Sequence, residues 1–99
     1  MVGGQKIDIV IVNRCDDNAL GSCLLGEGII RIANTFNCSG ERSQSATCKM
    51  NTLYHEITHA ILGTMGEVDL NNNERFVNCF SSFLAEAMDS VIAAQKQKK

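Results

Sequence analysis

The segment His55-Glu56-Ile57-Thr58-His59 combines residue types and a spacing that suit one defined chemistry, and it holds the only two histidines of the chain. Two histidines four positions apart lie about one turn from each other on the same face of a helix. Their imidazoles can therefore bind one zinc ion together. Glu56 projects beside that face, where it can accept a proton from a water molecule on the metal. The pattern predicts zinc-dependent hydrolysis, in the first place of a peptide bond.

The alternative is that the two histidines only line or cap a helix, because a five-residue pattern also arises by chance. The flanking residues 52–54 and 60–62 are apolar and compatible with a helix. The pattern is therefore expected on a buried helix, where an imidazole pair without a partner would cost stability. This reasoning favours a metal site.

A catalytic zinc site usually has three protein ligands and one open position for water. Because the chain has no third histidine, the third ligand must be a carboxylate or a thiolate. Glu74 is the preferred candidate, since the segment after His59 is long enough for the chain to reverse and bring Glu74 to the metal. A competing interpretation is a capping box in which Asn71 caps a helix and Glu74 bonds to the backbone at its start. Two acidic residues in the loop are weaker candidates: Glu67 and Asp69.

Three further residues have weaker claims to a role. Asn78 lies one turn after Glu74 and could orient that carboxylate, although it could equally be an ordinary polar helix residue. Cys48 shares the histidine face, but seven residues of helix rise about 10.5 Å, so it is interpreted as core. Tyr54, the only tyrosine, is a weak candidate for stabilising an oxyanion.

The first elements expected along the chain, ahead of the segment that holds these residues, are β-strands. Alternating, β-branched segments predict three of them, at residues 6–13, 19–25 and 28–34. Glycines at 26 and 28 predict a hairpin between the last two strands. Residues 14–18 are expected to form a turn and residues 35–44 a loop.

Two helices are expected after the sheet. The first should begin near residues 43–45 and run to about Leu62, with Gly63 and Gly66 at its end. The second should run from about Glu74 to Gln95, with an asparagine of the run 71–73 as its N-cap. Its apolar stripe is expected in the core: Phe76, Val77, Phe80, Phe83, Leu84, Met88 and Val91. The predicted fold class is α+β, a small antiparallel or mixed three-stranded sheet followed by two helices.

Composition bounds the remaining possibilities. The chain has 99 residues, 44% of them hydrophobic, which suits a single domain with one core. The net charge of −2 and the lack of a basic stripe speak against nucleic acid as a partner. No signal peptide and no apolar stretch of roughly 18 residues is recognisable, so we expect a soluble, cytoplasmic protein without membrane contact. The oligomeric state cannot be derived from composition.

The five cysteines are many for this length, but their number is odd and no Cys-x-x-Cys pair occurs. A zinc ribbon is thus disfavoured, and free thiols in a reducing compartment are the preferred interpretation. Pairing of Cys15 with Cys23 and of Cys38 with Cys48 stays open for oxidising conditions.

The segments 54–63 and 73–78 resemble the gluzincin clan of zinc metallopeptidases, in which two histidines come from the HExxH helix and a glutamate from the next helix. Within this clan the chain is most similar to small ImmA/IrrE-like and phage-encoded minimal metallopeptidase-like proteins. The resemblance covers roughly residues 28–90. It implies zinc ligands His55, His59 and Glu74, with Glu56 as general base. It also implies that an edge strand, expected at 28–34, pairs with an extended substrate.

Three functions are therefore weighed. The first is a zinc peptidase acting on a protein or peptide, by family analogy a regulatory protein. The second is a non-catalytic zinc-binding domain that serves as an interaction or regulatory module and whose ion stabilises a small core. The third is a metal-free interaction module that uses the phenylalanine-bearing face of the second helix.

Overall fold

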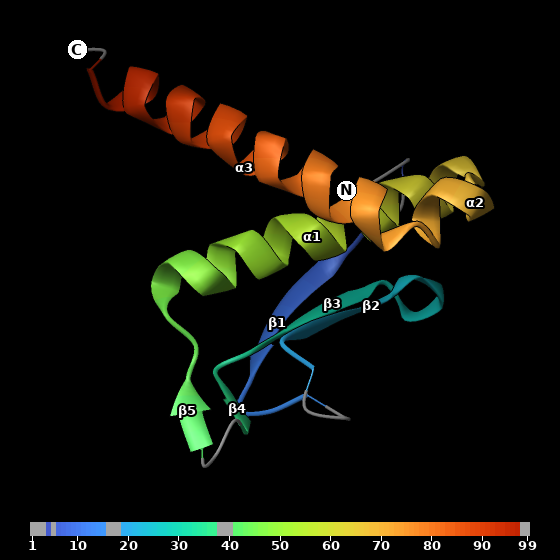
Figure 1. The fold of residues 1–99 in the computed structure, drawn as a ribbon, viewed down its shortest axis with the longest axis horizontal. Coiled ribbons are helices and arrows are strands. Elements are labelled where there is room, and N and C mark those ends of the chain that lie inside the picture. Colours follow the sequence, from blue (N-terminus) through green and yellow to red (C-terminus); the bar gives the residue numbers. More distant parts are fainter. Residues whose placement is uncertain (1–3, 5, 16–18, 38–40, 98–99) are drawn as a thin grey trace.

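A computed structural model describes residues 4, 6–15, 19–37 and 41–97 of the chain. The described part is α+β, as predicted, and its helix α1 lies between a sheet and a second long helix, α3 (Figure 1). Three strands form the main sheet: β1 (Asp8–Val12), β2 (Gly21–Leu24) and β3 (Ile29–Ala33). The helices are α1 (Ala46–Met65), the short α2 (Val68–Asn71) and α3 (Glu74–Gln97).

The main sheet is mixed, with the order β1-β3-β2. Strand β2 pairs with β3 antiparallel, so the predicted hairpin is confirmed, and a 3₁₀ turn (Leu25–Glu27) connects the two strands. Strand β1 runs parallel to β3 on its other side. The expectation that residues 28–34 form an edge strand is therefore wrong, because β3 is the central strand and β1 and β2 are the edges.

The predicted loop at 35–44 is only partly a loop. Two short strands, β4 (Thr35–Asn37) and β5 (Glu41–Ser43), pair antiparallel there as a separate small sheet. Local alternation is hard to recognise in strands of three residues, so periodicity did not reveal them. The predicted turn at 14–18 lies largely outside the described residues.

Helix α1 has recognisable signals at both ends. The Ser45 hydroxyl accepts a hydrogen bond from the backbone N–H of Cys48 at 3.1 Å, which caps the N-terminus. Gly66 ends the helix in the left-handed conformation (φ 78°), which glycine adopts without steric cost. Gly63 does not end the helix, as had been expected, but lies inside it. Its lack of a side chain leaves space for Leu25, whose Cδ2 would be 2.8 Å from an added Cβ.

The core lies between the sheet and α1. Ile30 and Ile32 of β3 are 1% and 3% exposed and pack against Ala60 of α1, which is fully buried. The opposite side of α1 packs on α3, where Val77, Ser81 and Ala85 are buried. The two layers together fix the orientation of α1, the helix that carries the HExxH pattern.

The phenylalanines of α3 are not core residues, contrary to the prediction. Phe80 and Phe83 are 45% and 65% exposed, and Phe76 stacks on Phe80 with ring centroids 5.8 Å apart. The reason is the wide apolar arc of α3. Helix α1 covers only the side that carries Val77, Ser81 and Ala85, and the phenylalanines lie roughly 100–160° around the helix from the middle of that side.

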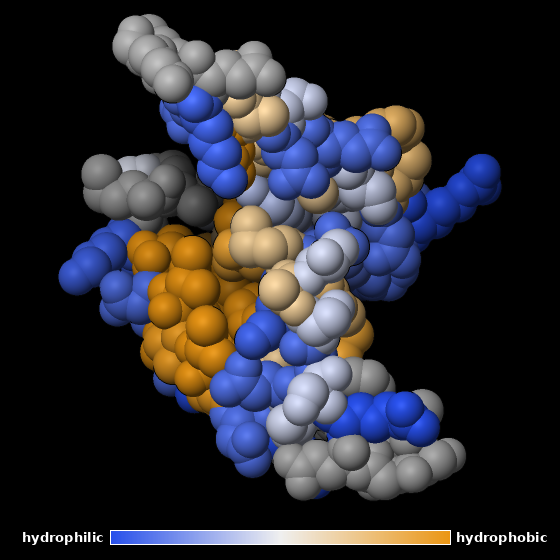
Figure 2. All heavy atoms as spheres, turned by 90° about the vertical axis from the view of Figure 1, so that its left-hand side faces the viewer, coloured by the Kyte–Doolittle hydropathy of each residue, from blue (hydrophilic) through white to orange (hydrophobic). Residues whose placement is uncertain are grey.

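Exposed hydrophobic residues also occur on the edge strand β1, where Ile9 and Ile11 are 53% and 60% exposed. Figure 2 shows that hydrophobic residues gather into one broad area on the face that it presents. By length and composition alone, α3 would also be able to cross a membrane, with a mean hydropathy of 1.2 over an 18-residue window within Glu74–Lys96. Helices of soluble proteins pass the same test, and Glu86 and Asp89 would be costly inside a bilayer. This feature supports no membrane assignment.

Candidate metal centre

The side chains of His55, His59 and Glu74 converge at one point between α1 and α3. One nitrogen from each histidine and one carboxylate oxygen all lie within 4.8 Å of one another. The Nε2 atoms of His55 and His59 are 3.6 Å and 3.5 Å from the two carboxylate oxygens of Glu74. Ligands at about 2.0–2.2 Å from a tetrahedral ion are separated by roughly 3.3–3.5 Å, so this group could hold a metal ion.

Local sequence explains why these three residues meet. The two histidine rings are 4.9 Å apart because they are one helical turn from each other. After Gly66 the chain reverses through α2, and the Asn73 side chain caps α3 by accepting a hydrogen bond from the N–H of Phe76 at 3.1 Å. Asn73 thereby takes the capping role, and the capping box from Asn71 to Glu74 does not form. Glu74 is the first residue of α3, so its side chain is free to face the histidines.

Asn71 holds the ring of His59, a contact that the sequence reasoning missed. His59 Nδ1 lies 2.6 Å from Asn71 Oδ1. Because an amide oxygen can only accept, Nδ1 donates this hydrogen bond, and Nε2, the atom that faces Glu74, is the nitrogen left for a metal ion. Hydrogen bonding of the second imidazole nitrogen is the usual way in which a metal-binding histidine is oriented. The run of three asparagines indicated only a helix cap, so it gave no signal for this role.

The electrostatics of His55 favour its neutral form. Burial lowers the pKa of His55, and the neighbouring His59 lowers it further, while Glu74 and a hydrogen bond with the Asn78 side chain act in the opposite direction. A neutral imidazole is the form that binds metal ions. Asn78 thus lies beside His55, whereas the sequence suggested that it would orient Glu74.

Glu56 lies next to the metal group without being part of it. It is only 6% exposed, and burial raises the pKa of its carboxyl group. The charge of His59 lowers this pKa and that of Glu74 raises it. A carboxyl group whose pKa is shifted toward neutrality is suited to take up and release a proton.

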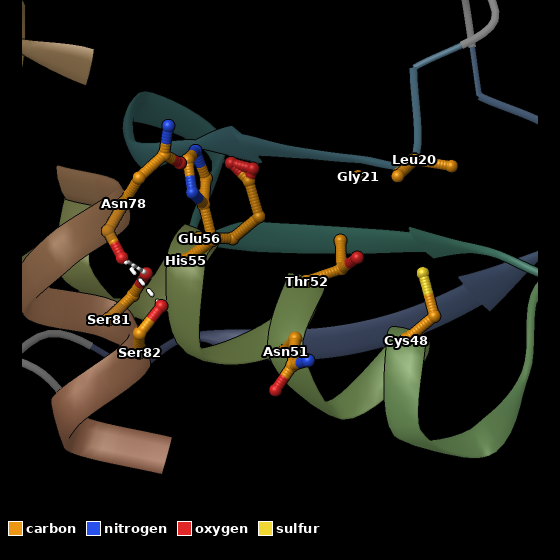
Figure 3. Close-up of a pocket in the computed structure, with 10 residues that line it drawn as sticks. All are labelled: Leu20, Gly21, Cys48, Asn51, Thr52, His55, Glu56, Asn78, Ser81 and Ser82. Atoms are coloured by element: carbon orange, nitrogen blue, oxygen red, sulfur yellow. Dashed lines mark hydrogen bonds between the residues drawn. The ribbon is translucent and has the colours of Figure 1, made fainter. Parts of the chain in front are cut away.

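A cavity of about 550 Å³ opens beside Glu56 (Figure 3). One side of it is formed by α1, with Thr52, His55 and Glu56. A second side is formed by α3, with Asn78 and Ser82. The start of β2, with Leu20 and Gly21, forms the third side. His55 thus belongs both to the metal group and to the wall of this cavity, which is large enough to hold a substrate side chain.

The open edge of β2 borders this cavity. The backbone N–H of Ala33 donates to the carbonyl of Leu20, so Leu20 and Ala33 are a hydrogen-bonded pair of the antiparallel ladder. Alternation along β2 then turns the N–H and C=O groups of Gly21 and Cys23 away from β3. Gly21 lines the cavity, and no partner for its outward-facing backbone groups or for those of Cys23 is found among the described residues.

Gly21 allows β2 to approach α1 closely. A Cβ atom at this position would lie 2.6 Å from Thr52 Cγ2, 3.0 Å from the carbonyl oxygen of Arg31 and 3.3 Å from Glu56 Cγ. The sequence predicted a strand at residues 19–25 and gave no signal for this role of Gly21. Its position shows that a side chain here would press on the residues that form the cavity.

We expect Gly21→Ala to destabilise the protein by about 1–3 kcal/mol, the usual range for overpacking a well-packed site. Gly26→Ala is the matched control, because a Cβ there would meet no atom within 4 Å. Urea denaturation of the two variants measures the difference. Equal midpoints for both would show that β2 and α1 can separate without cost.

The other candidates lie elsewhere. Glu67 and Asp69 are exposed and do not belong to the metal group. Tyr54 is buried and lines a second, smaller cavity instead of facing the histidines. Cys48, predicted as core, is half-buried and lines the cavity of Figure 3.

The cysteine pairings left open by the sequence do not form. Cys23, Cys48 and Cys79 carry free thiols, which excludes the bridges Cys15–Cys23 and Cys38–Cys48 in this structure. Cys38 itself lies outside the described residues. Burial raises the pKa of Cys23, and the nearby Glu56 raises it further, so its thiol form is favoured.

Comparison with known protein families, with curated proteins and with solved structures found no match for this chain. The function of this chain must therefore be inferred from the geometry of the metal group and of the cavity beside it.

Proposed function

We propose that this protein is a zinc-dependent peptidase. The observation that carries the proposal is the convergence of His55, His59 and Glu74 directly beside Glu56 and the cavity. Two imidazoles and one carboxylate are a donor set that suits a catalytic zinc ion. When bound, zinc would polarise the scissile carbonyl and lower the pKa of a coordinated water.

The number of ligands favours a catalytic ion over a structural one. A structural zinc site is closed by four protein ligands, whereas a catalytic site leaves one position open. Among the described residues, the metal group contains three histidine or acidic side chains and no cysteine. The Glu74 side chain is 64% exposed, so the open position would be accessible to water and to a peptide.

Within this proposal the chain's own residues have distinct tasks. Glu56 takes the proton from the attacking water and later delivers it to the leaving nitrogen. The free backbone groups of Gly21 and Cys23 pair with an extended substrate, so β2 takes the role that the sequence analysis gave to residues 28–34. The side chain of a neighbouring substrate residue enters the cavity.

The proposal is tested on the purified chain by elemental analysis and by mass spectrometry of a peptide library incubated with it. We expect one zinc ion per chain and cleavage that stops with a chelator and returns with added zinc. Bound zinc without any cleavage would favour the non-catalytic zinc domain. Failure to bind zinc would refute both and favour the metal-free interaction module.

Asn71 gives a second prediction about the metal group. Asn71→Ala should weaken zinc binding about 10–100-fold, the usual effect of removing the partner of a metal-binding histidine. Asn72→Ala is the control, since Asn72 is exposed and its side chain does not contact the histidines. Competition with a chromophoric chelator measures both affinities. An unchanged affinity of Asn71→Ala would mean that α1 alone orients His59.

A further inference from the structure

The buried side chain of Gln44, which is 4% exposed, determines whether two groups that line the cavity donate or accept hydrogen bonds. Its Nε2 donates to the backbone carbonyls of Leu20 (3.4 Å) and Ala33. Because carbonyl oxygens only accept, these contacts fix which end of the Gln44 amide is the nitrogen. The Oε1 atom must then face Thr52 and Cys48.

Thr52 and Cys48 both line the cavity, and each donates its side-chain proton to Gln44. The Thr52 hydroxyl donates to Gln44 Oε1 at 2.7 Å, and the Cys48 thiol donates to the same oxygen at 3.1 Å. A hydroxyl group has one proton and two lone pairs. Toward the cavity, Thr52 and Cys48 can therefore only accept hydrogen bonds.

On the α3 side of the cavity, two hydroxyl groups are likewise hydrogen-bond acceptors. The hydroxyls of Ser81 and Ser82 donate to the backbone carbonyl of Asn78 at 3.2 Å and 2.8 Å, shown as dashed lines in Figure 3. Their protons are likewise occupied, so both oxygens offer lone pairs to a ligand. Four hydroxyl or thiol groups from two helices thus line the cavity as acceptors.

The charged side chains around the cavity also favour a ligand that donates hydrogen bonds. Glu56 lies in its wall, and Asn51 lines both this cavity and the smaller one, to which Asp89 belongs. No lysine or arginine of the described residues lines either cavity. A ligand group here would meet the four acceptors and the Glu56 carboxyl group, together with the side-chain amides of Asn51 and Asn78.

We propose that this cavity selects a lysine or arginine side chain of the substrate. Both side chains carry several hydrogen-bond donors and no acceptor, which matches the four acceptor groups of Thr52, Cys48, Ser81 and Ser82. An acidic side chain would find no proton to accept from Thr52, Cys48, Ser81 or Ser82. This inference specifies the substrate of the proposed peptidase and in that sense depends on it.

A binding measurement tests the cavity independently of catalysis. N-acetyl-lysine amide, N-acetyl-norleucine amide and N-acetyl-glutamate amide are titrated into the zinc-loaded and the metal-free protein, and NMR shifts give the affinities. The norleucine compound has the same chain as lysine but no ammonium group. We expect the lysine compound to bind about tenfold more tightly than the norleucine one, the effect of one or two charge-assisted hydrogen bonds. Equal or tighter binding of the norleucine or glutamate compound would overturn the proposal.

Two serine variants test whether the preference for the lysine compound arises in the cavity. Ser82→Ala removes an acceptor of the cavity, and we expect it to reduce the lysine preference about threefold. Ser90→Ala is a matched control, because Ser90 makes the same bond one turn back, to Glu86 at 3.2 Å, and does not line either cavity. The lysine preference should be unchanged in this variant. An equal loss in both variants would mean that the cavity is not the binding site.

The peptide library separates this inference from the proposed function. Cleavage next to lysine or arginine would support both. Cleavage without that preference would leave the peptidase intact and refute the selectivity. Binding of the lysine compound without cleavage of any peptide would refute the peptidase and support the cavity as a binding site for basic side chains.

Discussion

Replacing Glu56 by glutamine is expected to abolish peptide hydrolysis while one zinc ion per chain is retained. The amide has nearly the shape of the carboxylate but cannot accept a proton from water. General acid–base catalysis contributes about 10²–10⁴-fold, and the rate should fall by at least this factor. Glu56 is not part of the group formed by His55, His59 and Glu74, so metal binding should persist.

The measurement combines cleavage rates with elemental analysis on the same preparations. Glu86→Gln is the control, because Glu86 is an exposed acid on α3 and lines neither cavity. It should cleave like the wild type. Turnover by Glu56→Gln at the wild-type rate would remove Glu56 from the mechanism, and loss of zinc in this variant would show that Glu56 acts as a ligand instead.

The metal group was predictable because its signals are local. The spacing of His55 and His59 acts within one helix, and Gly66 and Asn73 mark the helix ends that let the chain reverse. These signals predict that the chain reverses after the first helix, so that the start of the second helix lies near the histidines. The sequence already favoured Glu74 over Glu67 and Asp69, and the three-dimensional structure brings Glu74 together with the two histidines.

The surroundings of the group were not predictable because they depend on contacts between distant segments. Gln44 connects the ends of β2 and β3 with α1, and nothing in its immediate sequence marks that role. Gly21 lies in a segment predicted only as a strand, yet it is the point where β2 comes closest to Thr52 and Glu56. The strand order likewise depends on β1 returning beside β3, which alternation within each strand does not specify.

The exposed phenylalanines illustrate a limit of helical periodicity. The stripe on α3 was correctly recognised as apolar, but periodicity does not say which part of a wide stripe meets the next helix. Ser81 and Ala85, both small, lie at the contact with α1, whereas Phe80 and Phe83 lie to one side of it. Small residues permit close helix packing, which also brings the Ser81 and Ser82 hydroxyls to the cavity.

Removing the Glu74 carboxylate is the change with the largest expected effect on metal binding. In Glu74→Ala the two histidines would be the only remaining ligands of the group, and a zinc ion held by two imidazoles should be lost on desalting. Glu74→Gln keeps an amide oxygen at the same place but removes the negative charge, and it should bind zinc more weakly than the wild type. Elemental analysis after desalting provides the measurement, with Glu67→Ala and Asp69→Ala as controls that keep their zinc.

Unfolding experiments give a second readout for Glu74 that does not depend on desalting. A ligand that binds only the folded state, present at about 100 times its Kd, stabilises that state by about 2.7 kcal/mol. Added zinc should therefore raise the Tm of the wild type and of Glu67→Ala but not that of Glu74→Ala. A zinc-dependent rise in Tm of Glu74→Ala equal to that of the wild type would mean that another side chain completes the site. Loss of the rise in Asp69→Ala would identify that loop carboxylate as the ligand, since Asp69 lies in α2 two residues before Asn71, the partner of His59.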